Sequence, residues 1–248
     1  MRNIVIDAER RYENSKVLDT DVRKSQGKYY WATALPTDRH VEDTIAWVKG
    51  KRVLEVGCSA GEMAKLYTSV SASFVGVDIA DEAIKAAQDK HLVNAEFYCC
   101  DAHKLPFPDS DFDAVVVNSL LHHLDLEVAL AEISRVLTDE GILIFREPLG
   151  TNPLFQLYRL LTPSARTEDE RPFTFADIRL MSRFFNFKHT NWFGFTNILS
   201  AFMRAPSLRN ALTNLDQVLG KTVIRHYFWQ FCGVATKQTF KKTSIDLV

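Results

Sequence analysis

The chain has 248 residues, of which 46% are hydrophobic and 25% are charged, a balance typical of a folded globular protein. Its 30 basic and 31 acidic residues give a formal net charge of −1, so the sequence lacks the basic excess of most nucleic-acid-binding proteins. There is no run of 18 apolar residues and no apolar signal core near residue 1. We therefore expect no nucleic-acid partner, no integral membrane association and a cytoplasmic location.

The cysteines form no Cys-x-x-Cys pair, and we expect buried free thiols rather than disulfides. The four are Cys58, Cys99, Cys100 and Cys232.

The first fifty residues are polar with scattered aromatic residues, and a helix is predicted at their end. Apolar residues recur at helical spacing over 40–50, and Gly50 suits the end of that helix. Tyr29, Tyr30 and Trp31 come just before it.

Between residues 52 and 148 the pattern alternates between short apolar segments and amphipathic ones. The predicted strands are 52–56, 74–78, 95–100, 112–118 and 141–148. The predicted helices are 61–70, 80–90 and 128–137. Strands that alternate with helices predict a parallel sheet with right-handed crossovers, hence an α/β fold.

After Pro148 this rhythm ends, and the predicted elements are less regular. We expect helices over 152–161, 174–185 and 207–220, and strands over 188–195 and 227–237. Ten of the 17 phenylalanines lie between residues 173 and 231, where they either line an apolar substrate pocket or form ordinary core. The charged segment 165–173 either orders over that pocket or is a solvated loop.

The segment VLEVGCSAG, residues 53–61, places an acid inside an apolar strand that runs into a turn of small residues. Parallel sheets bind ligands at the carboxyl ends of their strands. A dinucleotide motif would need glycine where this chain has Ser59 and Glu62, and a carboxylate beside a pyrophosphate would repel it. S-adenosylmethionine (SAM) carries an ammonium that suits Glu55 and a carboxylate that suits the N–H groups of the turn.

This segment resembles the first motif of the class I SAM-dependent methyltransferases, in the branch that modifies small molecules. FVGVD, CDAHKLPFPDSDFDAVV, VNSLLHHL and GILIFREP resemble the motifs that follow, in the family's order. The resemblance covers about residues 52–148, with Ser59 in place of a frequent glycine.

The resemblance implies a Rossmann-like fold: a seven-stranded, mostly parallel sheet with helices on both faces, a C-terminal antiparallel strand and a helical insertion after the fifth strand. We expect a single methyltransferase domain over 1–248. Its predicted parts are an N-terminal cap (1–50), a cofactor-binding core (51–148), a substrate-side insertion (149–226) and a final strand (227–238).

The resemblance also implies a set of cofactor contacts. Asp78 would bind the ribose hydroxyls, Ile79 would pack on the adenine, and Asp101 would accept from the exocyclic amine with Ala102 supplying backbone. Asn118 would lie near the methionine end of SAM. The full expected set is Glu55, Gly57, Cys58, Ser59, Gly61, Asp78, Ile79, Asp101, Ala102, Asn118, Ser119, His123 and Tyr30.

Methyl transfer from a sulfonium needs no metal, and no convincing set of metal ligands is spaced along the chain. A hydroxyl acceptor would need a base. The candidates for catalytic residues are His122, His123 and Glu147; the histidines would otherwise brace the next helix, and Glu147 would otherwise form a structural ion pair. Tyr12 or Tyr30 would close over the sulfonium through a cation–π contact.

We therefore expect a SAM-dependent methyltransferase that modifies oxygen or nitrogen of a small, partly apolar metabolite. Two alternatives remain at this stage: a non-catalytic module of the same fold that serves a protein partner, and a nicotinamide oxidoreductase. The sequence leaves the acceptor and the oligomeric state open.

Overall fold

The computed structural model describes residues 10, 11, 14, 27–153, 156, 171–200 and 205–238, without the side chains of 27–33. Most of the predicted helix 152–161 and of the charged segment 165–173 lies outside these residues, as does Tyr12. Tyr30 lies in a helix, but its side chain is not among those described.

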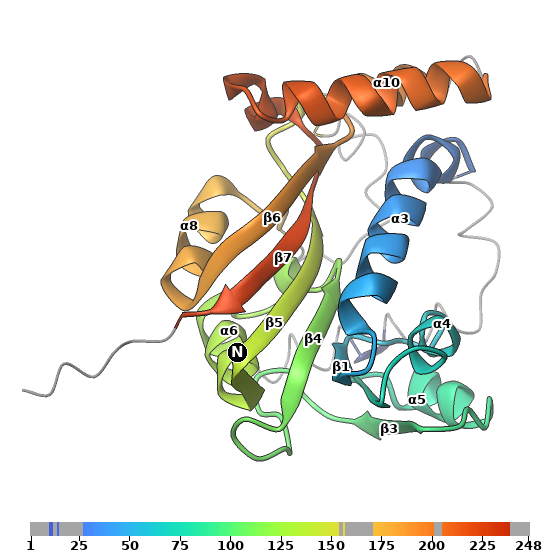
Figure 1. Cartoon of the computed structure of the whole chain (residues 1–248), viewed down its shortest axis with the longest axis vertical. Helices are drawn as coiled ribbons and strands as arrows, with labels where there is room; N and C mark the ends of the chain where they lie inside the picture. Colours follow the sequence, from blue (N-terminus) through green and yellow to red (C-terminus); the bar gives the residue numbers. More distant parts are fainter. Residues whose placement is uncertain are drawn as a thin grey trace, which may run out of the picture.

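A seven-stranded sheet forms the centre of the molecule, in the order β3-β2-β1-β4-β5-β7-β6 (Figure 1). The strands are β1 (Arg52–Val56), β2 (Ser73–Asp78), β3 (Ala95–Cys99), β4 (Phe112–Asn118), β5 (Leu137–Pro148), β6 (Phe185–Phe193) and β7 (Gln230–Lys237). The pairs among β1 to β5 are parallel, and β7 runs antiparallel to both of its neighbours. The predicted fold class is therefore confirmed, including the C-terminal antiparallel strand.

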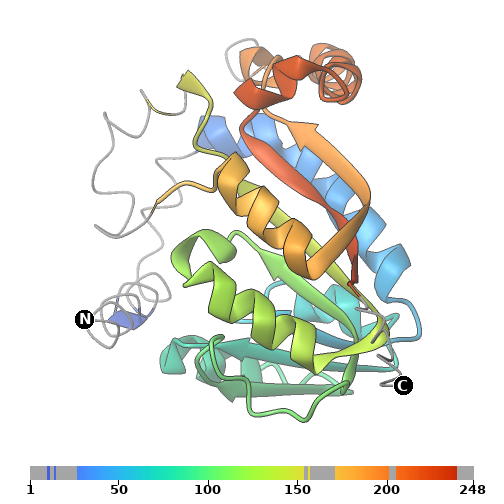
Figure 2. The same cartoon turned by 90° about the vertical axis from the view of Figure 1, so that its left-hand side faces the viewer.

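Helices cover both faces of the sheet, as Figures 1 and 2 show. On one face lie α3 (Gly27–Val48), α4 (Ala64–Thr68) and α5 (Asp81–Gln88). On the other lie α6 (Leu126–Val136) and α8 (Phe175–Phe184). The described residues also include the short 3-10 helices η1 (Leu121–His123), η3 (Asn197–Leu199) and η4 (Val223–Tyr227).

Alternation along the strands divides the core into two clusters. Leu54 of β1 packs in the cluster that faces α6 and α8, whereas Val53 packs in the cluster beneath α3, α4 and α5. Glu55 alternates onto the same face as Val53. This strand therefore buries apolar residues on both faces, and its one acid lies on the α3 side of the sheet.

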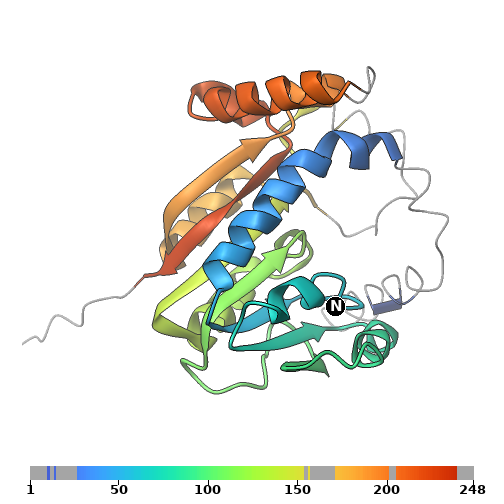
Figure 3. The ribbon, with the colours of Figure 1, turned by 45° about the vertical axis from the view of Figure 1, so that its right-hand side comes forward.

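Helix α10 (Pro206–Leu219) lies across the end of the sheet at which β6 stops (Figures 1 and 3). Its fully buried Asp216 fixes the loop that follows β6. One carboxylate oxygen accepts from the N–H groups of Gly194, Phe195 and Asn197, and the other from the N–H and hydroxyl of Thr196. A single side chain thus attaches α10 to the end of the sheet.

Several predicted boundaries are wrong. Helix α3 begins at Gly27 and not at residue 40. The early start is hard to predict, because Pro36 lies inside the helix and proline usually interrupts one. Strand β5 begins at Leu137, which pairs with Phe112 before the register shifts. Helix α4 has only five residues where ten were predicted. Helix α8 begins as expected, with a capping box between Thr174 and Asp177.

The phenylalanine-rich C-terminal part is mostly core rather than a substrate pocket. Phe173, Phe185, Phe228 and Phe231 are each at most 1% exposed and belong to the cluster on the α6 side. The thiols are free, as expected, but Cys99 is exposed, so the prediction that all four are buried is wrong.

Candidate cofactor site

The turn after β1 has the backbone shape that its small residues predict. Gly57, Ser59 and Gly61 all have positive φ, at 78°, 49° and 70°. A Cβ on Gly57 would come within 2.9 Å of the Leu120 side chain. Both this contact and the positive φ therefore disfavour a larger residue at position 57.

Four of the five N–H groups of this turn already donate within the protein. Those of Gly57 and Cys58 donate to the Val77 carbonyl, that of Gly61 to the Cys58 carbonyl, and that of Ser59 to Asp78. The turn is therefore attached to the end of β2, and it offers a carboxylate fewer hydrogen-bond donors than its sequence suggests.

Glu55 is the most unusual group of the site. Its side chain is 4% exposed, and its Oε2 has no hydrogen-bond partner. Burial, together with the nearby charges of Glu62 and Asp78, raises its pKa to about 8. A cationic ligand would stabilise the ionised form of Glu55, whereas a pyrophosphate would destabilise that form further. An orphaned buried carboxyl beside two further acids thus fits the ammonium and sulfonium of SAM.

Asp78 closes β2 with its carboxylate fixed by two backbone groups. Oδ2 accepts from the Ser59 N–H at 2.8 Å, and Oδ1 accepts from the Ala80 N–H at 2.9 Å. The carbonyl of the next residue, Ile79, accepts from Arg10 Nε at 3.1 Å. Part of the N-terminal segment therefore lies against the strand end where the sequence predicts the ribose and adenine.

Asp101 follows β3, and a histidine that sequence reasoning overlooked holds it in place. His103 Nε2 accepts from the Asp125 N–H at 2.9 Å, so in the neutral ring the proton lies on Nδ1. That Nδ1–H donates to Asp101 Oδ1 at 2.6 Å, where the His103 N–H also donates. Both contacts use the same oxygen of Asp101. Ala102, next in the chain, is half-buried.

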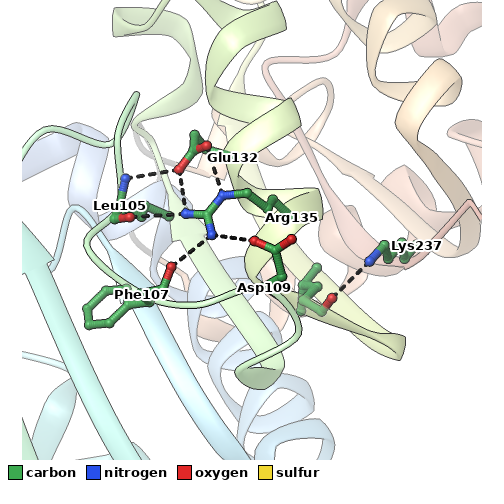
Figure 4. A network of polar contacts seen from close by, with 7 residues as sticks. Leu105, Phe107, Asp109, Glu132, Arg135 and Lys237 are labelled. Carbon is green, nitrogen blue, oxygen red and sulfur yellow. Dashed lines mark hydrogen bonds and ion pairs between the residues drawn. The ribbon is translucent and has the colours of Figure 1, made fainter.

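The loop that continues from Asp101 is held by Arg135 of α6 (Figure 4). The guanidinium donates to the carbonyls of Leu105 and Phe107 and pairs with Asp109 and Glu132. Glu132 also accepts from the Leu105 N–H. A helix on one face of the sheet thereby fixes the loop that runs from Asp101 back to the start of β4.

Beyond β4, the structure brings together all three candidates for catalysis. The fully buried Glu147 accepts from the N–H groups of Leu120 and Leu121 through Oε1 and from His122 Nδ1, at 2.7 Å, through Oε2. The His123 ring packs on that of His122 with centroids 4.1 Å apart. Through these contacts Glu147 and His122 hold the 3-10 helix η1 in place. The catalytic roles of His122, His123 and Glu147 stay predictions.

Asn118 ends β4 and faces helix α3, with the exposed Ser119 after it at φ 53°. Asn118 Oδ1 lies 3.2 Å from Nε2 of His40, which the sequence gave no reason to select. Burial, reinforced by the positive charge of Arg146 and opposed by the bond to Asn118, lowers the pKa of His40 to about 4. The ring is therefore neutral near pH 7 and donates its Nε2–H to Asn118.

The described residues include neither a membrane-spanning helix nor a cluster of metal ligands. None of their helices is long and apolar enough to cross a membrane. Within the same residues, no three side chains of His, Cys, Asp or Glu gather as a metal site would require.

Comparison with known proteins finds relatives for the segment that forms this edge of the sheet. A family model described as a methyltransferase domain matches residues 54–145. The fatty-acid O-methyltransferase of Mycolicibacterium smegmatis is 38% identical over 112 residues, 44% of this chain and 41% of the relative. Phthiotriol/phenolphthiotriol dimycocerosates methyltransferase 1 of Mycobacterium ulcerans is 36% identical over 122 residues, 48% of this chain and 43% of the relative.

A solved structure of a SAM-dependent methyltransferase from Methanosarcina mazei has the same fold. Its TM-score is 0.55 at 21% identity, and the match covers 77% of this chain and 94% of that one. The curated relatives named above are matched over less than half of their own length. The sequence match lies on the strands, turns and acids described here, and the cofactor that they indicate is SAM. Residues 54–145 of this chain thus match the methyltransferase-domain family, and the fold around them is that of a SAM-dependent methyltransferase.

Proposed function

We propose that this protein transfers the methyl group of SAM to an oxygen or nitrogen of a small, partly apolar acceptor. The observation that carries the proposal is the buried, unpaired carboxyl of Glu55, with Asp78 and Asp101 at the ends of the two neighbouring parallel strands. Three acids at adjacent strand ends suit a cationic nucleoside better than an anionic one.

Each acid has a separate part in this proposal. Glu55 pairs with the ammonium of SAM, Asp78 with the ribose hydroxyls, and Asp101 with the exocyclic amine through the oxygen that His103 leaves unused. Ile79 and Ala102 lie beside the adenine, and the turn from Gly57 through Cys58 and Ser59 to Gly61 approaches the methionine end. Asn118, Ser119, His123 and Tyr30 complete the proposed cofactor contacts.

The methyl group of SAM is electrophilic because it is bound to a positively charged sulfur. The protein contributes by positioning the acceptor. An acceptor that is held in line with the S–CH3 bond reacts far faster than one that is free in solution. The Leu120–His123 segment lies at the end of β4, where it is fixed by three hydrogen bonds to Glu147.

The acceptor is proposed from the relatives. Their names specify a fatty acid and a phthiotriol dimycocerosate, both largely apolar molecules modified by a methyltransferase. They support a small apolar acceptor and, in the first case, methylation on oxygen.

Titration calorimetry with SAM, S-adenosylhomocysteine and NAD tests the cofactor assignment. We expect the first two to bind and NAD not to bind. Asp78→Asn should weaken SAM binding by about tenfold, as expected for loss of a charged hydrogen-bond acceptor. The matched control is Asp89→Asn, which changes an exposed acid just after α5 and should leave the affinity unchanged.

Incubating the protein with cell extract and methyl-labelled SAM tests turnover. One labelled small molecule that depends on the protein is the expected result. SAM binding without any labelled product would favour the non-catalytic alternative. Tight binding of NAD in place of SAM would refute the proposal as a whole.

A further inference from the structure

Arg146 is a positive charge at the carboxyl edge of the sheet and has no acidic partner among the described residues. It lies on β5 beside Asn118 of β4, and its half-buried side chain faces α3. Its Nη1 donates to the hydroxyl of Thr37 at 2.8 Å, while its buried Nε has no hydrogen-bond partner. Among the described residues, no carboxylate lies within 4.0 Å of the guanidinium.

None of the described titratable neighbours of Arg146 forms an ion pair with it. His40 is neutral near pH 7, because burial and Arg146 itself lower its pKa to about 4. On the other side, Cys232 pairs with Arg146 across β5 and β7, and burial raises the pKa of its thiol to about 12. The exposed Asp43 of α3 also acts on that thiol, but it forms no ion pair with Arg146. A partly buried cation without a paired anion favours an anionic ligand.

We propose that Arg146 binds the carboxylate of the methyl acceptor, so that the acceptor class is a carboxylic acid and the product a methyl ester. This inference rests on the proposed function and narrows it. A guanidinium matches a carboxylate in a two-pronged geometry, and Nε is one of the N–H groups that such a pair uses.

SAM has a carboxylate of its own, and the positions of the charges argue against it as the partner of Arg146. That carboxylate is attached to the same carbon as the ammonium, which Glu55 receives on β1. The charges of Glu55 and Arg146 both act on the Tyr67 hydroxyl, but the two side chains form no ion pair with each other. Arg146 lies two strands further on, about 10 Å across the sheet at the usual strand spacing.

The chemistry of a carboxylate also fits the contacts of the site. One carboxylate oxygen forms a bond to the methyl carbon, the S–CH3 bond breaks, and its electron pair stays on sulfur, giving a methyl ester and S-adenosylhomocysteine. No proton moves, because a carboxylic acid is already ionised at neutral pH. The reaction therefore needs no general base, which agrees with a Glu147 occupied by η1.

The test uses octanoic, dodecanoic and hexadecanoic acids, the three matching alcohols, and methyl-labelled SAM. Mild alkali releases the label of a methyl ester as methanol but leaves methyl ethers and methylamines intact. We expect alkali-labile product from the acids and little product from the alcohols. Arg146→Gln should lower kcat/KM for the acids by about tenfold or more while the Kd of SAM stays within about twofold.

Binding provides a readout that does not depend on turnover. In the presence of S-adenosylhomocysteine, dodecanoate should bind the wild type and bind Arg146→Gln about tenfold more weakly. The matched control, Arg52→Gln, removes an arginine at the opposite end of the sheet, where it pairs with Asp111. It should change neither measurement.

Four results would overturn the inference: alcohols methylated in preference to acids, no acid methylated although SAM binds, equal losses for both classes in Arg146→Gln, or a tenfold weaker SAM affinity in that variant with unchanged binding of dodecanoate. The last result would assign Arg146 to the carboxylate of SAM. Failure of the wild type to bind SAM at all would instead refute the proposed function.

Discussion

Replacing Glu55 with Gln should make the protein more stable at neutral pH while weakening its binding of SAM. The pKa of Glu55 is raised from 4.5 to about 8, mainly by burial. A carboxyl whose folded-state pKa is raised stabilises the folded state most below its unfolded pKa, and this contribution is lost as the pH rises towards the folded pKa. Gln has a similar shape and does not titrate.

The size of the effect follows from the two pKa values. At 1.36 kcal/mol per pKa unit, the wild type loses about 1 kcal/mol of stability by pH 5 and about 3 kcal/mol by pH 7. Glu55→Gln should therefore be more stable than the wild type by these amounts, with little further change above pH 8.5. Urea unfolding at pH 5, 7 and 8.5 measures the difference, with Glu42→Gln on the exposed side of α3 as the control.

The same titration predicts that SAM binding releases protons. Below about pH 8, Glu55 is largely protonated in the folded protein, and pairing with an ammonium ionises it. Calorimetry in buffers of different ionisation enthalpy should detect this proton in the wild type and not in Glu55→Gln. Equal stability differences at pH 5 and pH 7, or no proton release, would refute the reasoning.

Three further substitutions test the groups that hold the site. His103→Ala should raise the Kd of SAM about tenfold by freeing Asp101, with a smaller effect on an inosine analogue that lacks the exocyclic amine; equal effects on both ligands would contradict this role. Arg135→Gln should lower the free energy of unfolding by about 1–3 kcal/mol in urea titrations, because two loop carbonyls lose their partner. Asp216→Asn should cost about 2–3 kcal/mol by the same measurement, and an unchanged unfolding midpoint would show that the loop after β6 does not depend on this carboxylate.

The sheet could be predicted where local pattern and tertiary structure agree. The five strands of the parallel region are short apolar segments between turns, and each was located to within a few residues except for the start of β5. The start of helix α3 could not be predicted, because its first half contains aromatic residues and a proline and lacks the regular apolar spacing of a helix. The extension of β5 to Leu137 depends on a pairing with Phe112 that no local pattern records.

Some residues of the candidate site could also be predicted from the sequence, and others could not. Glu55, Asp78 and Asp101 stand at strand ends, so sequence order alone places them on one edge of the sheet. His103, His40 and the bracing role of Glu147 depend on contacts between residues 22, 78 and 25 positions apart in the chain. No periodicity reveals such contacts. For the phenylalanine-rich region, composition left open whether these residues line a pocket or form core, and the structure shows mostly core.

The position of β7 has a consequence for synthesis. This strand, the last of the seven along the chain, pairs with β5 on one side and β6 on the other. During translation β6 therefore emerges with no neighbour to join, and its backbone stays unpaired until residues 230–237 have left the ribosome. A nascent chain that stalls before that point would hold a five-stranded remnant with an open edge at β5, a natural substrate for chaperones that bind exposed strands.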